Sequence, residues 1–419
     1  MKAKDIKEQI SNYLDVYTKS WAFSGAIAAI KDGEIVFNKA YGYANIEHKV
    51  ENTPVTRFRI WSITKQFTAA AILMLEERGL LRVEDSMRTH FPEWVDLSSE
   101  VTIHHLLTHT SGIFNYSNLP DSHKTFYRLE HDKSDLVKMF TSKPLDFEPG
   151  TQWNYSNSGY YLLGMLIEKL SGKTFSEFLS ENILLPLGMV NTGVDDGRKI
   201  VQNSATGYYL NGDDLIHCLY VNMNLILSSG AMYSTVGDLL IWDQALNSDK
   251  LLSRDSIDKM NTQYKNNYGY GVSINMSNNR EVVHHNGSCE GFLTEIHRYV
   301  EDDFAVVVLS NYGFTAVNKL CKVIASIAFG DEYKMPSKPP VFPLSSSILE
   351  NYLGVYGGDG FKLELKKDKE DILLIIDDEY ILPVYLISEN VFHHTWIDEE
   401  YEFTKDENGQ LSLWGLKKK

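Results

Sequence analysis

The sequence predicts an α+β protein that carries a second, smaller β-domain at its C-terminal end. Helical and strand-like segments are interspersed along residues 1–334, whereas apolar and polar side chains alternate along residues 345–419. The two regions are separated by residues 335–344, which hold four of the eleven prolines and therefore predict a stiff linker. We expect one domain over residues 1–334, the linker over 335–344, and a small β-barrel or β-sheet domain over 345–419.

Apolar residues at helical spacing, bounded by capping and turn residues, predict the helices before the linker. They lie at residues 5–19, 62–79, 102–110, 134–140, 160–170, 174–185, 234–246 and 317–329. Strand-like runs bounded by turn residues predict the strands, at residues 23–30, 34–41, 268–274, 281–285, 293–300 and 304–309. We expect residues 190–230 to be mainly loops and residues 114–133 to form a surface excursion.

Composition restricts the function classes. Of the 419 residues, 43% are hydrophobic and 23% charged, which is typical of a soluble globular protein. A net charge of −16 argues against nucleic acid as the main partner, because an acidic surface repels phosphates. Cys218, Cys289 and Cys321 are too few for a disulfide framework.

The N-terminal segment and the apolar runs bear on the compartment. No apolar run approaches the ~18 residues that a membrane span needs. The first residues, MKAKDIKEQISNYLDVY, are typical of an amphipathic helix rather than of a signal peptide. As given, the sequence therefore predicts a cytoplasmic protein without a membrane span, or an exported one if a signal peptide has been removed.

The helix that begins near Ser62 carries a hydroxyl and an amine three residues apart. Ser62 and Lys65 therefore emerge on one face of the helix, which places a base beside a nucleophile. The positive end of the helix dipole also favours developing negative charge. The plain alternative is that Ser62 caps the helix and Lys65 points to water. Four residues alone favour that alternative, because Ser-x-x-Lys is common by chance.

Two further segments carry chemistry that complements Ser62. Tyr155-Ser156-Asn157 lies in a turn-rich loop before an apolar helix, and His285-Asn286-Gly287 is expected at the end of a strand. Acyl transfer needs a nucleophile, a base, an acid for the leaving group and donors for the oxyanion. Taken alone, the tyrosine and asparagine would be turn residues and the histidine a sheet-edge residue.

Each requirement of acyl transfer has a candidate. Ser62 is the nucleophile, and Lys65 is the base if burial lowers its pKa. Tyr155 can relay the proton if Lys65 keeps its phenol partly ionised. The backbone N–H groups of Ser62 and Ser288 can form the oxyanion hole, and glycine at 287 lets a substrate approach the strand edge.

These three segments resemble the motifs of the serine β-lactamase and penicillin-binding-protein superfamily, and the Tyr-x-Asn form of the second resembles its class C side. Their flanks resemble family segments in the same order over residues 20–330, namely SITKQFTAAAI, IHHLLTHTSGI, FEPGTQWNYSNSGYYLLGMLIEKLSG and SSGAMYSTVGDLLIW. The resemblance implies an antiparallel sheet flanked by helices plus a helical subdomain. It also implies an acylated Ser62, proton transfer by Lys65 and Tyr155, and an Asn157 that bonds Lys65 and the substrate amide.

One departure from the family pattern concerns the substrate. Most penicillin-binding proteins and class C enzymes begin the third motif with lysine, which helps to hold a substrate carboxylate, whereas this chain has His285. A histidine is only partly charged near neutral pH, so we expect weaker carboxylate binding. The His-x-Gly form resembles that of family esterases and D-amino-acid peptidases. The expected function is a serine hydrolase that cleaves amide or ester bonds of small substrates, namely D-amino-acid peptides, esters or β-lactams.

Alternatives to this interpretation remain open. The protein could be a penicillin-binding sensor that acylates with little turnover, or a scaffold without catalysis. His284 offers a second register for the third motif. His104, His105 and His109 suggest a metal, but without a third ligand at a zinc-like spacing a structural role is favoured, and no metal or cofactor is expected. The β-domain resembles the lipocalin-like extension of some relatives and could bind substrate, cover the cleft, mediate a homodimer or be a structural appendage.

Overall fold

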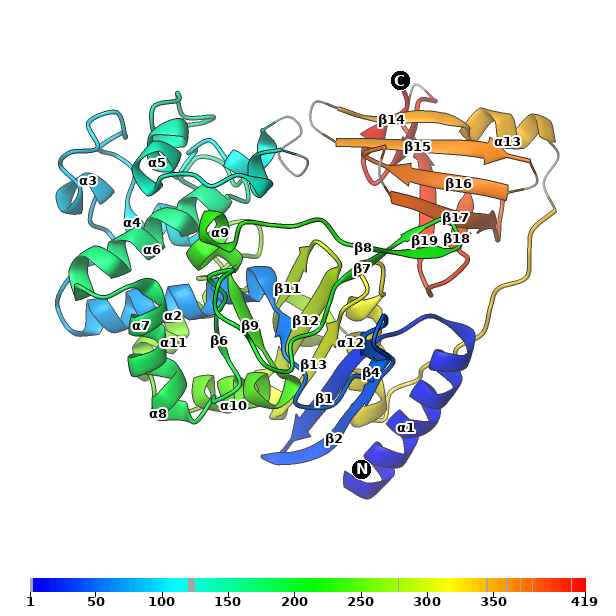
Figure 1. The fold of residues 1–419 in the computed structure, drawn as a ribbon, viewed down its shortest axis with the longest axis horizontal. Helices are drawn as coiled ribbons and strands as arrows, with labels where there is room; N and C mark the ends of the chain where they lie inside the picture. Colours follow the sequence, from blue (N-terminus) through cyan, green and yellow to red (C-terminus); the bar gives the residue numbers. More distant parts are fainter. Residues whose placement is uncertain are drawn as a thin grey trace.

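The computed structural model describes residues 3–119, 125–277, 279–343, 346–358, 361–369, 371–378, 380–407 and 409–419. Leu344 and Ser345, at the predicted end of the linker, lie outside the described residues, as do residues 120–124 of the predicted surface excursion. The chain forms a central sheet with a helical part on one side and a C-terminal sheet on the other (Figure 1).

The central sheet has six antiparallel strands. In spatial order they are β10 (Ser273–Ser277), β11 (Arg280–Cys289), β12 (Phe292–Tyr299), β13 (Phe304–Ser310), β1 (Gly25–Lys31) and β2 (Glu34–Tyr41). Strand β1 pairs with β13 over its whole length, so the beginning and the end of this part of the chain share one sheet. The antiparallel sheet flanked by helices is thereby confirmed.

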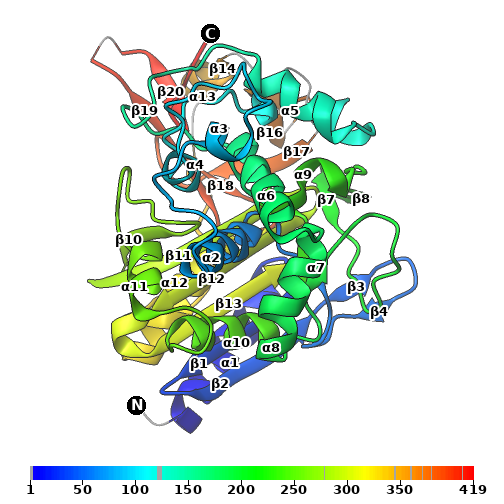
Figure 2. The same cartoon turned by 90° about the vertical axis from the view of Figure 1, so that its left-hand side faces the viewer.

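Successive residues of each strand point to opposite faces, and each face is covered by helices. One face packs on α1 (Ala3–Ser20) and α12 (Val317–Phe329) in a shared apolar core. The other packs on α2 (Thr64–Glu77) and α10 (Val236–Leu246) in the largest core of the molecule. Figure 2 shows α2 in front of this second face.

The remaining helical elements build the helical part of the molecule around α2. They are η1 (Trp61–Ile63), α3 (Met87–His90), α4 (Ile103–Leu107), η2 (Tyr116–Asn118), η3 (Phe126–Arg128), α5 (Lys133–Thr141), α6 (Asn157–Ser171), α7 (Phe175–Leu179), η4 (Ser180–Leu184), α8 (Leu185–Leu187), α9 (Met223–Gly230) and α11 (Arg254–Met260). Short strands connect this part to the sheet, namely β3 (Tyr43–Asn45), β4 (Val50–Glu51), β5 (Phe58–Arg59), β6 (Gly193–Val194) and β9 (Met232–Ser234). A 3-10 turn, η5 (Val300–Asp302), joins β12 to β13.

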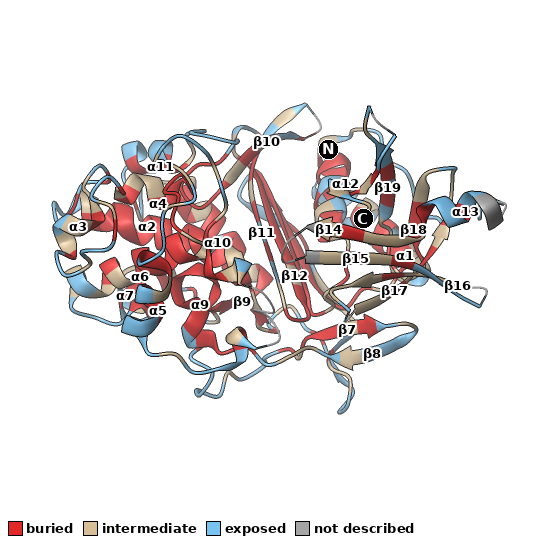
Figure 3. Ribbon diagram, turned by 90° about the horizontal axis from the view of Figure 1, so that it is seen from above, coloured by how far each residue is buried: buried red, intermediate tan, exposed pale blue. Residues whose placement is uncertain are grey.

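The C-terminal sheet is antiparallel and nearly closes on itself. Helix α13 (Ser346–Tyr352) precedes its strands, which are β14 (Gly354–Gly358), β15 (Phe361–Asp368), β16 (Asp371–Ile376), β17 (Tyr380–Leu386), β18 (Val391–His394), β19 (Glu400–Lys405), β20 (Leu411–Leu413) and β21 (Leu416–Lys417). A bridge between Tyr356 and Lys418 brings the last strand beside the first. In Figure 3, β11 and β12 lie between this sheet and the helical part.

The segment expected to be mainly loop holds two of the differences from the sequence-based expectations. Residues 190–230 contain α9 and a hairpin of β7 (Tyr208–Asn211) and β8 (Asp214–His217). The hairpin joins the C-terminal sheet where Asn211 pairs with Ile381, and Leu210 is buried in the core of that sheet. A partner distant in sequence, rather than local pattern, therefore fixes these strands.

Three other segments differ from expectation. The helix expected at 174–185 is divided into α7, a π-helical turn and α8. The third motif does not end a strand, because β11 continues to Cys289. Of the run expected to be a strand at 268–274, only the end lies in β10.

None of the helices among the described residues combines the length and the apolarity that crossing a membrane requires.

Candidate active site

Ser62 lies in the 3-10 turn η1, immediately before α2, and does not cap that helix. The N-cap position is Ile63, which has no side chain able to bond the first turn. Trp61, just before Ser62, has a φ of 45°, a conformation that L side chains rarely adopt. The capping alternative considered from the sequence is therefore wrong, and the local backbone turns the Ser62 hydroxyl into a cleft.

Lys65 points into the protein rather than to water. Its side chain is fully buried, and its Nζ lies 3.1 Å from Ser62 Oγ, 2.8 Å from Asn157 Oδ1 and 2.7 Å from the Ser229 carbonyl oxygen. Burial lowers the pKa of the Lys65 amine well below its usual value, because the interior disfavours the charged form. The amine thus has the surroundings of a base held beside a hydroxyl.

Tyr155 extends from the loop before α6 and lies over the amine. The Lys65 Nζ is 4.8 Å from the centre of the Tyr155 ring. Burial raises the pKa of the Tyr155 phenol, and a hydrogen bond with Ser62 opposes the shift only in part. The phenol is therefore protonated at neutral pH, which contradicts the expectation that Lys65 keeps it partly ionised.

Asn157 is the first residue of α6, and its amide group is held on both sides. The Oδ1 atom accepts from Lys65, while Nδ2 donates to Ser117 Oγ at 2.8 Å. The backbone N–H of Asn157 donates to Asn115 Oδ1 at 3.2 Å. Asn115 and Ser117 belong to the segment that we expected to be a surface excursion, and here they support the site.

Ser229 is a second contact that the sequence reasoning missed. It lies near the end of α9, where Leu227 has a φ of 27° and interrupts the helical backbone. Ser229 is one of the last four residues of α9, so its carbonyl oxygen has no partner within the helix and accepts from Lys65. The segment SSGAMYS resembles a family segment, but the contact is made by a backbone carbonyl, which has no side-chain signal in the sequence.

His285 is buried on β11 and neutral. Its Nδ1 lies 2.6 Å from the carbonyl oxygen of Asn286 and must donate to it, so Nε2 accepts from the Tyr268 hydroxyl at 3.0 Å. Burial is the main reason why the pKa of His285 is lowered to about 3. The expected partial charge near neutral pH is therefore absent, which strengthens the contrast with a lysine at this position.

Gly287 and Ser288 occupy opposite faces of β11. A Cβ at position 287 would lie 2.1 Å from the Ile60 carbonyl oxygen and 2.4 Å from Thr294 Oγ1. Glycine at this position therefore allows β11 to pack against the chain before η1, and its expected role in the approach of a substrate stays a prediction. Ser288 is exposed and lines the same cleft as Ser62.

The cleft at Ser62 has a volume of about 430 Å³, and none of the described residues that line it is charged. Its described lining residues are Trp61, Ser62, Ser117, Tyr127, Trp153, Tyr155, Asn157, Ile226, Ser229, Gly230, Asn286, Ser288 and Cys289. Burial raises the pKa of the Cys289 thiol, so this residue is not a thiolate. The cleft thus presents aromatic and neutral polar groups to a ligand.

The three histidines near residue 105 have local partners. His105 completes a capping box with Thr102 at the start of α4, and His104 Nδ1 lies 2.8 Å from the Tyr270 hydroxyl. His109 is buried, accepts from a backbone N–H through Nδ1, and lies 4.3 Å from the Tyr155 ring, centre to centre. These contacts assign structural positions to all three, with His109 supporting the Tyr155 loop.

Comparisons with known proteins agree over most of the chain. Residues 10–322 match the protein-family model described as Beta-lactamase. Penicillin-binding protein 4* of Bacillus subtilis (strain 168) is 30% identical over 438 residues, covering 97% of this chain and 96% of that protein. An octameric penicillin-binding protein homologue from Pyrococcus abyssi has a TM-score of 0.69 and 26% identity, covering 98% of this chain and 99% of that one.

A D-amino acid amidase from Ochrobactrum anthropi SV3 shares the fold. Its structure, in complex with D-phenylalanine, gives a TM-score of 0.68 at 22% identity, covering 78% of this chain and 99% of that one.

Proposed function

The chain belongs to the β-lactamase family, and from that premise we propose that it is a serine hydrolase that cleaves amide or ester bonds of small substrates through an acyl-Ser62 intermediate. The observation that carries this proposal is the environment of the Lys65 amine. A neutral amine has two N–H donors and one lone pair. The Asn157 and Ser229 oxygens can only accept, so they take both donors, and the lone pair is left facing the Ser62 hydroxyl.

The proposed acylation follows from these contacts. Ser62 Oγ attacks the carbonyl carbon of the substrate while its proton passes to Lys65 Nζ. The substrate oxygen gains negative charge, which the backbone N–H groups of Ser62 and Ser288 stabilise. The bond to the leaving alcohol or amine then breaks as Tyr155 donates its phenolic proton to that group, and Tyr155 regains a proton from Lys65.

Deacylation reverses the proton path. A water molecule attacks the acyl carbon and gives its proton to the Tyr155–Lys65 pair, which returns a proton to Ser62 Oγ as the acid leaves. Asn157 holds the amine in place during both steps. His285 and Gly287 act indirectly, His285 through Tyr268 and Gly287 through the packing of β11 on η1.

The cleft favours uncharged substrates over substrates that carry a free carboxylate. The described residues that line it carry no ionised side chain, and the buried His285 is neutral at the position where the family pattern described above has lysine. A free carboxylate close to the scissile bond would lose its hydration without gaining a cation. We therefore place esters and neutral amides before β-lactams in the order of preference.

One experiment tests the proposal. The protein and its Ser62→Ala variant are incubated with p-nitrophenyl esters, with D-phenylalanine amide, chosen because an amidase shares the fold, and with a fluorescent penicillin. Turnover that is lost in Ser62→Ala supports the hydrolase. A stable penicillin adduct without turnover supports the second candidate, a penicillin-binding sensor, which the similarity to penicillin-binding protein 4* favours. Neither turnover nor labelling would overturn both.

A further inference from the structure

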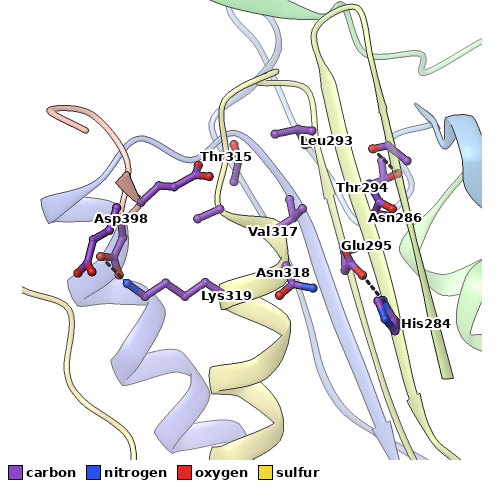
Figure 4. Close-up of a pocket in the computed structure, with 14 residues that line it drawn as sticks. His284, Asn286, Leu293, Thr294, Glu295, Thr315, Val317, Asn318, Lys319 and Asp398 are labelled. Carbon is purple, nitrogen blue, oxygen red and sulfur yellow. Dashed lines mark hydrogen bonds and ion pairs between the residues drawn. The ribbon is translucent and has the colours of Figure 1, made fainter. Parts of the chain in front are cut away.

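Three metal-ligating side chains meet on the face of the central sheet that is turned away from α2. His284 lies on β11, and Glu295 and His297 lie on β12 directly beside it. Glu295 Oε1 is 3.1 Å from His284 Nδ1 and 3.1 Å from His297 Nε2. Among the described residues, these ligand atoms form a group within 4.8 Å of one another. Figure 4 shows Glu295 and His284 side by side on the sheet.

The cluster is reached through a second cavity, distinct from the Ser62 cleft. This cavity has a volume of about 570 Å³ and lies between β11, the start of α12 and the C-terminal sheet. His284 and Glu295 form part of one wall, and Lys319 and Asp398, which are 2.7 Å apart, form part of the opposite side (Figure 4). The His284 side chain is 19% exposed, whereas those of Glu295 and His297 are buried. A small hydrated ion can therefore enter from the side of His284.

We propose that His284, Glu295 and His297 bind a divalent transition-metal ion, with Zn²⁺ as the best match to the ligand set. Two imidazole nitrogens and one carboxylate oxygen, with water in the fourth position, make a known zinc coordination. Metal–ligand bonds of about 2.0–2.2 Å in a tetrahedral site separate neighbouring ligand atoms by roughly 3.4 Å, close to the 3.1 Å separations of the Glu295 oxygen from the two nitrogens.

Neighbouring groups orient the three ligands. The second nitrogen of His284 lies 2.9 Å from the Asn275 side-chain amide, which fixes the ring with Nδ1 toward Glu295. The Asn318 side chain lies 3.3 Å from His297 Nε2 at the cavity wall and could supply an amide oxygen after rotation of its amide group. The charge of Lys322 acts on His297 and opposes cation binding, but the buried Glu295 carboxylate stands closer.

With both imidazoles neutral, a purely hydrogen-bonded cluster leaves the buried Glu295 carboxylate without a cation in contact with it. In that case the Glu295 carboxylate must draw a proton donor from each imidazole, which fixes both tautomers. His297 then donates through Nε2, and its Nδ1 acceptor is buried without a hydrogen-bond partner among the described residues. A dication between the three side chains would neutralise the buried carboxylate. Nδ1 of His297 would then carry the proton and would still have no partner among the described residues, so this nitrogen does not distinguish the two cases.

Metal binding can be measured directly on the full chain. Protein dialysed against a chelator is titrated with Zn²⁺ by calorimetry and with Co²⁺ by visible absorption, and its thermal unfolding is followed with and without Zn²⁺. We expect one ion per chain, tetrahedral Co²⁺ bands and a higher Tm with Zn²⁺. Failure of the wild-type protein to bind either ion would overturn the proposal, whatever the hydrolase assays give.

Matched variants locate the ion. His284→Asn removes the partly exposed ligand and should weaken Zn²⁺ binding by at least about tenfold, and Glu295→Gln should do the same. The control is His217→Asn, because His217 is an exposed histidine that pairs with Glu47 elsewhere on the surface. Unchanged affinity in His284→Asn, or loss of affinity in the control alone, would show that the ion binds elsewhere and refute the assignment.

Discussion

Replacing Asn157 with aspartate should shift the pH dependence of catalysis to higher pH while the geometry of the site stays the same. The side-chain oxygen of residue 157 lies 2.8 Å from Lys65 Nζ, so Asn157→Asp puts a negative charge in direct contact with the proposed base. An adjacent opposite charge favours the protonated amine and raises its pKa by about 1 to 3. Lys65 can accept the Ser62 proton only when it is unprotonated, so the variant should lose activity at low pH and regain it as the pH rises.

The magnitude follows from the fraction of unprotonated amine. At any pH below both pKa values, that fraction falls tenfold for each unit by which the pKa rises, so kcat/KM on the acidic limb should drop about 10- to 1000-fold. At high pH, where the amine is unprotonated in both proteins, the difference should shrink to the loss of the hydrogen bond from Asn157 to Ser117, about tenfold or less.

The assay is a profile of kcat/KM against pH with a p-nitrophenyl ester, and it needs two controls. Asn118→Asp adds the same charge on the exposed surface of η2, where water screens it, and should leave the profile unchanged. Asn157→Ala removes the same contacts without adding a charge and should lower the rate without an alkaline shift. An Asn157→Asp profile that coincides in shape with the wild-type profile would refute the role of Lys65 as the base.

Three further predictions concern stability. Burial lowers the pKa of His285 to about 3 from an ordinary 6.5, so the stability that the neutral side chain contributes is present above pH 6.5 and is lost as the pH falls toward 3. Between pH 6 and pH 5, the free energy of unfolding in urea should therefore fall by about 1 kcal/mol less in His285→Gln than in the wild type. Gly287→Ala should lower the free energy of unfolding by about 1–3 kcal/mol, because the added Cβ meets the backbone before η1. The control, Gly237→Ala, has its nearest neighbour at 3.9 Å and should be neutral or stabilising by up to about 1 kcal/mol. Equal Tm values for the two variants would contradict this reasoning. Asp243→Asn should cost about 3–5 kcal/mol, measured by urea unfolding, since it leaves the fully buried Arg298 without its carboxylate partner, and a loss below about 1 kcal/mol would contradict the reasoning.

The elements that the sequence predicted well are those whose signal is local. Helix α12 has the predicted bounds, because its apolar stripe is continuous and Gly330 ends it. The hairpin of β1 and β2 follows from two strand-like runs around a turn. In contrast, β7 and β8 were missed because a strand pairing with Ile381, far along the chain, defines them, and no local pattern encodes that partner.

The residues of the candidate site also divide into those with a local sequence signal and those without one. Ser62 and Lys65 could be found because one helical turn brings them together, and Tyr155 and His285 because their motifs resemble those of a family. Ser229 could not be found, since it contacts Lys65 through a backbone carbonyl at the end of a helix, which has no side-chain signal in the sequence. The lowered pKa of Lys65 agrees with the condition set for its role as a base, whereas the neutral forms of Tyr155 and His285 were not predicted, because they depend on burial rather than on residue type. The division of the chain at the linker stays a prediction.

Burial is the main cause of the charge states at the centre of the site. It lowers the pKa of Lys65, His109 and His285 and raises that of Tyr155 and Tyr268, so that each of these side chains is driven toward its neutral form. A lysine in place of His285 would add a cation that helps to keep a neighbouring amine unprotonated and also binds carboxylates. With a neutral histidine there, exclusion of water must keep the amine a base, and the same exclusion penalises a charged substrate. The residue at 285 therefore links the way in which the base is activated to the kind of substrate that the cleft favours.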